Sequence, residues 1–84
     1  MNFWPRLPRS DWLKVAEHAR DAVALDPEFG EAWRRIAAAL DNLGINRAES
    51  VRAATRAYEL RDRLQPFERG LAEASYYSTV LGDH

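Results

Sequence analysis

Cysteine is absent from the 84-residue chain, and lysine and histidine are nearly absent. Without cysteine there can be no disulfide framework, no thiolate zinc site and no thiol nucleophile. Lys14 is the only lysine, and no glycine-rich phosphate loop ending in Gly-Lys is present. The two histidines, His18 and the terminal His84, lack the neighbouring residues that a catalytic triad or a metal centre requires. We therefore expect no enzymatic activity, no bound metal and no cofactor.

Long apolar runs and an excess of either charge are also missing. No stretch approaches the ~18 consecutive apolar residues of a membrane helix. The N-terminal sequence is interrupted by Pro5 and Pro8, which is not typical of a secretory signal. Twelve basic and thirteen acidic residues give a net charge of −1, so no general attraction to nucleic acid or anionic lipid arises. These absences predict a cytoplasmic protein with no nucleic-acid partner and no membrane partner.

The distribution of apolar residues favours helices. Apolar side chains recur at three- and four-residue spacings, and no alternating apolar–polar run bounded by turns is found, so no strand is predicted. Asp26-Pro27, Gly44 and Gly82 provide helix ends, and Pro66 suits a first helical turn. The helices are predicted over residues 10–25, 28–43, 47–64 and 66–81. Their short connections favour antiparallel neighbours, in either a closed four-helix bundle or a stack of helical hairpins.

Each predicted helix carries an apolar stripe suited to packing. The stripes of the first, second and fourth helices consist of Trp12, Val15, Ala19, Ala22 and Val23; of Phe29, Trp33, Ile36, Leu40 and Leu43; and of Phe67, Leu71, Ala74, Tyr77 and Leu81. The third helix has two stripes, which indicates two packing partners. The side chains of Ser10 or Asp11, and of Asn46, are expected to accept hydrogen bonds from first-turn amides.

An internal repeat distinguishes between the two architectures. Ala22 and Ala57 hold equivalent places near the ends of the first and third helices, 35 residues apart. Gly44 and Gly82 lie 38 residues apart, and each follows a leucine. A period in the mid-thirties built from two helices is typical of a helical solenoid.

The residues within this period resemble the tetratricopeptide repeat family. The resemblance rests on Ala32-Trp33, Ile36, Leu40, Leu43-Gly44 and Ala57, and on the Ala-Leu-Asp-Pro sequence that ends at Pro27. The segment from Ala57 to Leu64 is similar to arrays in bacterial multi-repeat regulators. The resemblance implies an all-α fold of four antiparallel helices as stacked helical hairpins over residues 10–84. Residues 1–9 are then an irregular segment in which Phe3, Trp4 and Leu7 could cap the first helix.

The resemblance also implies a function, because such repeats bind peptides or partner proteins through a concave helix face. Transferred position by position, the partner-binding residues are Glu31, Arg34, Arg35, Asn42, Arg69, Glu73 and Tyr76. The competing interpretation is that these are ordinary solvated side chains. Two alternative functions remain open: a structural module that homodimerises through exposed end helices, and a fragment of a larger signalling regulator of the same repeat type.

Overall fold

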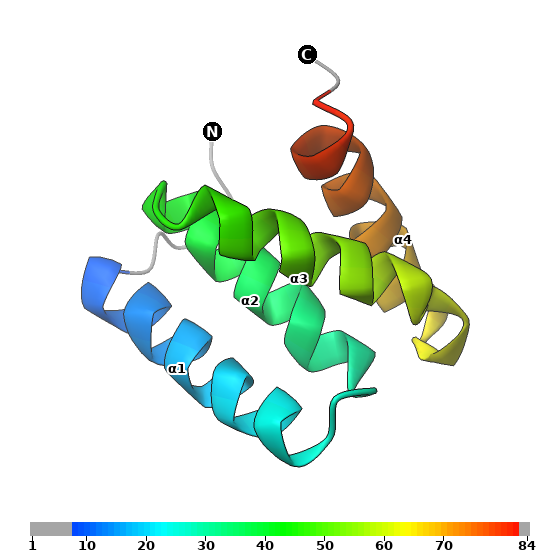
Figure 1. Ribbon diagram of the computed structural model, residues 1–84, viewed down its shortest axis with the longest axis horizontal. Helices are drawn as coiled ribbons and strands as arrows, with labels where there is room; N and C mark the ends of the chain where they lie inside the picture. Colours follow the sequence, from blue (N-terminus) through cyan, green and yellow to red (C-terminus); the bar gives the residue numbers. More distant parts are fainter. Residues whose placement is uncertain (1–7, 83–84) are drawn as a thin grey trace.

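The chain is helical throughout the range that the structure describes. The computed structural model describes residues 8–82, and no strand occurs in this range (Figure 1). The elements are α1 (Arg9–Leu25), α2 (Gly30–Leu43), α3 (Arg47–Glu59), the 3-10 turn η1 (Arg61–Arg63), α4 (Pro66–Ser75) and the π-helical turn η2 (Tyr76–Val80). The predicted all-helical class with four main helices is confirmed. The suggested cap of Phe3, Trp4 and Leu7 lies outside the described residues.

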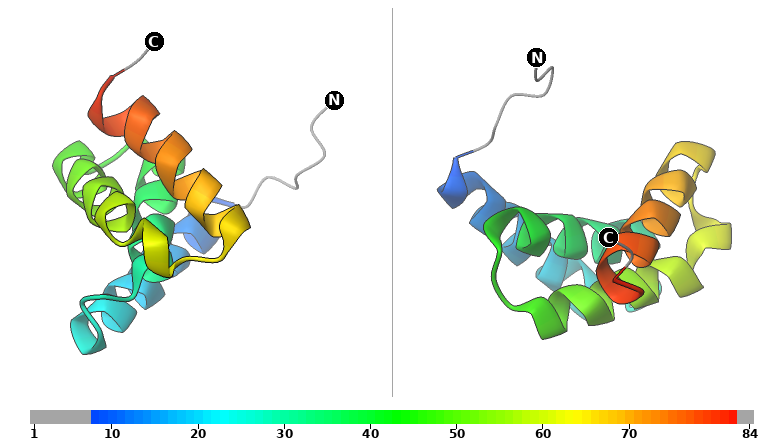
Figure 2. Two further views of the ribbon diagram at one scale, coloured as in Figure 1. Left: turned by 90° about the vertical axis from the view of Figure 1, so that its right-hand side faces the viewer. Right: turned by 90° about the horizontal axis from the view of Figure 1, so that it is seen from above.

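Helix α2 is the central element of the fold. It contacts α1, α3 and α4, and α3 also contacts α4 and η2. Figures 1 and 2 show α1 on one side of α2 and α4 on the other. The molecule therefore has two outer edges, one formed by α1 and the other by α4 with η2.

The core is built mainly from alanine. Its buried members are Ala16, Ala19, Ala32, Ile36, Ala37, Ala39, Leu40, Ala53 and Ala54. Only two large apolar side chains, Ile36 and Leu40, are fully buried within the described residues. Small side chains let the helix backbones approach closely, but each contributes little apolar area. The stability of the fold therefore depends heavily on these two residues.

The helix starts differ from the sequence prediction. Helix α1 begins at Arg9, and the carbonyl oxygen of Pro8 accepts hydrogen bonds from the amides of Asp11 and Trp12 at 2.9 and 3.2 Å. The expected side-chain cap by Ser10 or Asp11 is therefore wrong, because both residues already lie within the first turn. Asn46 does precede α3, but its side chain makes no capping bond either.

The start of α2 and the end of α3 also differ from their predicted positions. Helix α2 begins at Gly30 rather than at 28, because Asp26 holds the preceding turn: its carboxylate accepts the Glu28 amide at 3.1 Å, and its carbonyl accepts the Phe29 amide at 3.0 Å. Helix α3 ends at Glu59 rather than at 64, and η1 follows. The residue before Pro66 is extended, as proline requires of its predecessor, so a continuous helix could not reach α4.

Two residues that were predicted to end or begin a helix do so in the structure. Gly44 ends α2 in the left-handed conformation, with φ of 68°. This conformation costs glycine little because it has no Cβ. Pro66 occupies the first turn of α4, where its missing amide proton is not needed.

Asp41 joins three elements through what we call the Asp41 cluster: Asp41, Arg47, Ser50 and Thr79. The Ser50 hydroxyl donates to Asp41 Oδ1 at 2.6 Å, and the Thr79 hydroxyl donates to Asp41 Oδ2 at 2.8 Å. Arg47 also donates to the Thr79 carbonyl at 3.1 Å. Ser50 and Thr79 are only 1% and 5% exposed, whereas Asp41 is exposed, so the bonds lie at the boundary between the core and the solvent. The cluster attaches η2, and with it α4, to the α2–α3 pair.

Candidate functional site

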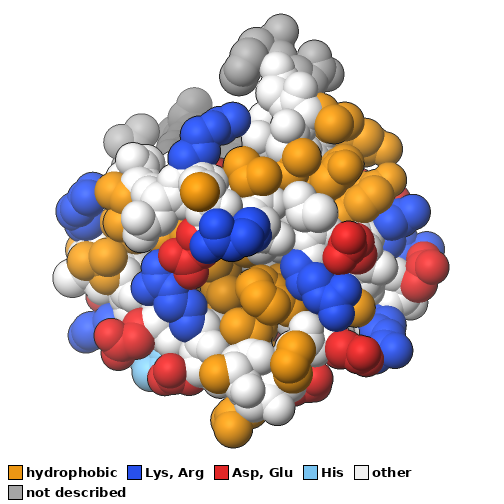
Figure 3. Space-filling model, in the orientation of Figure 1, with side chains coloured by type: hydrophobic (Ala, Val, Ile, Leu, Met, Phe, Trp, Pro, Cys, Tyr) orange, Lys and Arg blue, Asp and Glu red, His pale blue; other side chains and the backbone are white. Residues whose placement is uncertain are grey.

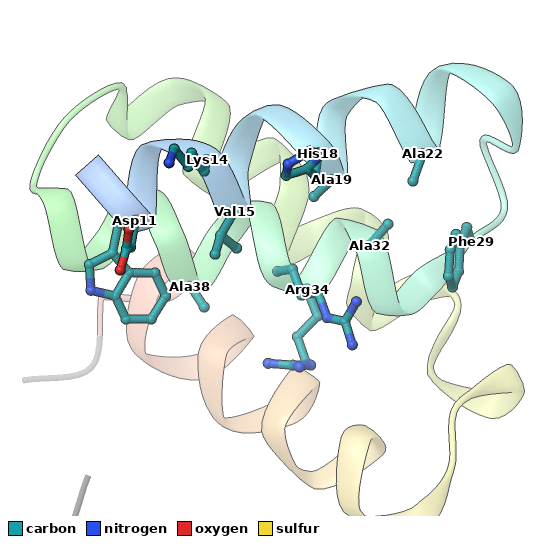
Figure 4. Close-up of a pocket in the computed structure, with 12 residues that line it drawn as sticks. Asp11, Lys14, Val15, His18, Ala19, Ala22, Phe29, Ala32, Arg34 and Ala38 are labelled. Atoms are coloured by element: carbon teal, nitrogen blue, oxygen red, sulfur yellow. The ribbon is translucent and has the colours of Figure 1, made fainter. Parts of the chain in front are cut away.

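A groove of about 640 Å³ lies between α1 and the N-terminal two-thirds of α2 (Figure 4). Helix α1 contributes Asp11, Trp12, Lys14, Val15, His18, Ala19 and Ala22, and the α2 side contributes Phe29, Ala32, Arg34, Arg35 and Ala38. Seven of these twelve side chains are apolar and four are charged. This composition is typical of surfaces that bind an apolar ligand or a helix.

The apolar residues of the groove are arranged by depth. Ala19 and Ala32 are buried and form its floor, while Val15 and Ala38 are half-buried and form its walls. Figure 4 shows Phe29 at the end of the groove opposite Asp11. Since the floor consists of alanines, a helix with small or medium apolar side chains can approach it closely.

The charged residues of the groove are mainly basic. Lys14 is exposed on the α1 side, and Arg34 and Arg35 lie on the α2 side. Among the described residues, Asp11 is the only acidic one in the lining. This arrangement favours a ligand whose apolar face is flanked by acidic groups.

The structure assigns different surroundings to the four predicted binding residues of α2. Arg34 and Arg35 line the groove. Arg35 also pairs with Glu31 one turn earlier at 3.2 Å, and Asn42 donates to the Ala38 carbonyl of its own helix at 2.8 Å. Of these four residues, Arg34 and Arg35 therefore lie in the groove lining, and Glu31 is next to it through its pair with Arg35.

Arg34 additionally connects α2 to α4. Its guanidinium forms a charge-assisted hydrogen bond with the Glu68 carboxylate, and the two side chains are only 16% and 18% exposed. An ion pair so largely withdrawn from water is screened less than a surface pair. Arg34 thus takes part in both the groove and the attachment of α4.

The three predicted binding residues of α4 and η2 lie away from the groove lining. Arg69 donates to the Arg61 carbonyl at 3.3 Å, and Glu73 lies 3.8 Å from the Arg61 guanidinium. Tyr76 stacks on Tyr58, with 4.1 Å between the ring centroids. These residues have partners within the chain, and a role in partner binding stays a prediction for them.

An aromatic cluster links α3 to η2. Tyr77 meets the rings of Tyr58 and Tyr76 edge-on, with centroids 6.1 and 5.9 Å apart, and the Arg61 guanidinium lies 3.9 Å from the Tyr58 ring centroid. The proximity of the Tyr58 hydroxyl raises the pKa of Tyr77 above its ordinary value. With the Asp41 cluster, these contacts fix η2 on α3.

The groove residues of α1 were not among the predicted binding residues. Trp12, Val15, Ala19 and Ala22 were expected to share one face, and they do line one groove. The sequence pattern assigned that face to the core because an apolar stripe looks the same whether or not another helix covers it. In the structure that face is partly covered: Ala19 is buried in the core, and Trp12, Val15 and Ala22 pack against the core while they stay partly exposed to the groove.

Helix α1 is held to α3 by a bidentate ion pair. Arg20 donates to both carboxylate oxygens of Glu49, at 2.7 Å each. The hydrogen bonds from Arg20 lower the pKa of Glu49 below its ordinary value of 4.5, and they outweigh the opposing effect of burial. The pair adds a contact between α1 and α3 to the packing of α1 on α2, which places this wall of the groove.

We expect Glu49→Gln to lower the free energy of unfolding at pH 7 by up to about 1 kcal/mol, as for partly exposed pairs. Because the pKa of Glu49 is lowered in the folded state, its stabilisation is present above pH 4.5 and is lost as the pH falls through the folded pKa. The difference between variant and parent should therefore shrink on acidification. Urea unfolding of the variant and the parent at pH 7 and at about pH 3 measures this difference in the free energy of unfolding.

The matched control is Glu59→Gln. Glu59 forms an exposed pair with Arg56 at 3.2 Å within α3, so its removal should change stability little at either pH. An equal loss for Glu49→Gln at both pH values would contradict the expected linkage.

Within residues 8–82, no helix is both long and apolar enough to cross a membrane, and no three potential metal-binding side chains are grouped together. Comparisons with models of known families, with characterised proteins and with solved structures find no match to this chain.

Proposed function

We propose that the chain is a non-catalytic protein–protein interaction module of the tetratricopeptide repeat type, which binds a peptide or partner protein on its concave helix face. In this proposal the four helices are stacked antiparallel hairpins, and the α1–α2 groove with Arg34 and Arg35 is the central part of that face. A cytoplasmic location, a bacterial source and the absence of nucleic-acid and membrane partners belong to the same proposal. The observation that carries it is the apolar groove with its mainly basic rim.

The groove favours one chemical class of partner. An amphipathic helix could place small apolar side chains over Ala19 and Ala32 while its flanks approach Lys14 and Arg35. Acidic flanks would complement these basic groups. The proposed partner is therefore an acidic amphipathic helix rather than a basic one.

The test uses a synthetic probe of this chemistry: a helical peptide of about 18 residues, or five turns, made of Leu, Ala and Glu. We expect it to bind the full chain, and a version with Lys in place of Glu to bind at least about tenfold more weakly, a difference of about 1.4 kcal/mol. Ala38→Glu should also weaken binding of the acidic peptide at least about tenfold, because it places a carboxylate in the groove wall. Fluorescence anisotropy measures both effects.

The control is Ala48→Glu, on an exposed position of α3 outside the groove lining. Circular dichroism and thermal unfolding should show that both variants fold. If the parent and Ala38→Glu bind the acidic peptide with equal affinity, the groove is not the binding surface.

A second candidate function is self-association. The α4 edge exposes several large apolar side chains, namely Phe67, Leu71, Tyr77 and Leu81. An exposed apolar face of this kind is typical of an interaction surface. The proposed alternatives are a homodimer formed through end helices and the same module acting within a larger signalling regulator.

A further inference from the structure

The outer face of α4 and η2 is an uncharged stripe, which we call the α4 stripe. It consists of Phe67, Gly70, Leu71, Ala74, Tyr77, Ser78 and Leu81, and all seven are exposed. Phe67 is 71% exposed, and no atom lies within 4 Å of the place where a Cβ of Gly70 would stand. Figure 3 shows hydrophobic side chains gathered over this edge of the molecule. Nothing in the described residues covers the stripe.

The internal repeat relates the α4 stripe to a covered stripe on α2. A shift of 38 residues carries Phe29, Trp33, Ile36, Leu40 and Leu43 onto Phe67, Leu71, Ala74, Ser78 and Leu81. On α2, the last three of these five residues are buried in the fold. The α4 stripe thus corresponds to a surface that elsewhere in the same chain is packed against a neighbouring helix.

The groove has a covered counterpart as well. A shift of 35 residues carries Val15, His18, Ala19 and Ala22 of the groove onto Ser50, Ala53, Ala54 and Ala57 of α3. All four of these α3 residues are buried, and α3 packs against α2. The groove wall on α1 is therefore the counterpart of the α3 surface that α2 contacts.

We infer that the α1–α2 groove binds the α4 stripe of a second copy of this chain. The inference rests on the proposed function, since it names the partner of the same groove. Within one chain, the buried part of the α2 stripe belongs to a core that α2 shares with α3 and α1. Between chains, the equivalent α4 stripe packs on α1, the equivalent of α3. The chain supplies both halves of the contact, and the two halves lie on opposite edges of the fold (Figure 1).

The sizes of the side chains at the two surfaces are complementary. The α4 stripe has Ala74 and Ser78 at the positions where α2 has the larger Ile36 and Leu40. The groove has the larger Val15 and His18 at the positions where α3 has Ser50 and Ala53. Smaller side chains on the α4 stripe are thus matched by larger side chains in the groove, as close packing between the two surfaces requires.

The charges of the two surfaces are also compatible. The α4 stripe carries no charged residue, so placing it on the apolar floor buries no unpaired charge. Glu73 and Arg69 both lie on α4 beside the stripe, and each has an oppositely charged neighbour in its own chain, Arg61 and Asp62. The electrostatic case for the contact is therefore that the stripe itself brings no charge into the groove.

The proposed contact joins two different surfaces, so it does not close on itself as a two-fold dimer does. A copy whose groove is occupied still has a free α4 stripe. A copy whose α4 stripe is bound still has a free groove. Association should therefore be open-ended, with a mean size that grows with concentration.

The experiment is analytical ultracentrifugation of the full chain and two variants, from micromolar to millimolar concentration. Ala38→Glu blocks the groove and Leu71→Glu blocks the α4 stripe. We expect the parent to associate and each variant alone to associate at least about tenfold more weakly, which is about 1.4 kcal/mol. An equimolar mixture of the two variants should form a 1:1 dimer and nothing larger, because one supplies an intact stripe and the other an intact groove. If either variant unfolds, Ala22→Glu and Phe67→Glu test the same two surfaces.

Several outcomes would overturn the inference. Association of Ala38→Glu alone at parental strength would indicate a contact between two α4 stripes. A parent that stays monomeric at millimolar concentration, yet binds the acidic peptide through its groove, would refute the second copy as partner while supporting the proposed function. A monomeric parent in which Trp4→Ser increases peptide binding would assign the groove to residues 1–7 instead. If Ala38→Glu changes neither association nor peptide binding, both proposals fail.

Discussion

Replacing Leu40 with alanine should lower the free energy of unfolding by about 2–5 kcal/mol. Leu40 is 1% exposed, and with Ile36 it forms the only pair of large, fully buried apolar side chains in the described residues. The surrounding alanines have no flexible side chains that could refill the cavity. At ~0.05–0.15 kcal/mol per residue, a chain of this length has a total stability of roughly 4–13 kcal/mol. The variant should therefore be largely destabilised, which urea unfolding followed by circular dichroism measures.

The matched control is Leu25→Ala at the end of α1. Leu25 is 90% exposed, so its truncation should change the free energy of unfolding by less than about 0.5 kcal/mol. A loss below about 1 kcal/mol for Leu40→Ala would contradict the thin, alanine-based core.

Replacing Asp41 with alanine should cost about 2–3 kcal/mol, because two buried hydroxyl groups lose the acceptor that they share. The Thr79 hydroxyl has no other hydrogen-bond acceptor in the described structure, and the Ser50 hydroxyl retains only a long contact of 3.5 Å to the Ala37 carbonyl. Since the Asp41 cluster attaches η2 to the α2–α3 pair, the loss should be concentrated at the C-terminal edge. Hydrogen exchange should accelerate in α4 and η2 more than in α1.

Asp41→Asn is the control for this prediction. Its amide keeps one acceptor oxygen and gains a donor, and a hydroxyl can rotate to accept as well as to donate. We expect this variant to recover more than half of the lost stability. Equal losses for the two variants, or exchange that accelerates uniformly along the chain, would contradict a local attachment by the carboxylate.

Residues that act through local backbone preferences were predictable from the sequence. Gly44 ends α2 and Pro66 begins α4 because each has a conformational preference that does not depend on the fold. The all-helical class followed in the same way from three- and four-residue spacing. These features depend on neighbours within about one turn of helix.

Features that depend on distant contacts were not predictable. The π-helical turn η2 carries Tyr76, which stacks on Tyr58, and Thr79, which bonds to Asp41 of another helix. No local pattern distinguishes this turn from regular helix. The same holds for the groove, because the apolar stripe that contains Val15 gives no indication of whether another helix covers it. The sequence pattern put Arg34 and Arg35 on one helix face, which the structure places beside the groove, but it gave no sign of the α1 wall.

Arg34 has a further consequence, because one guanidinium takes part in two contacts. It lines the groove, and it pairs with Glu68 of α4. A ligand that displaces water from the groove lowers the local dielectric constant and so strengthens the attraction between these two charges. Occupation of one edge is thereby coupled energetically to the position of the helix that forms the other edge. In an open-ended series of copies, such coupling would make each addition favour the next.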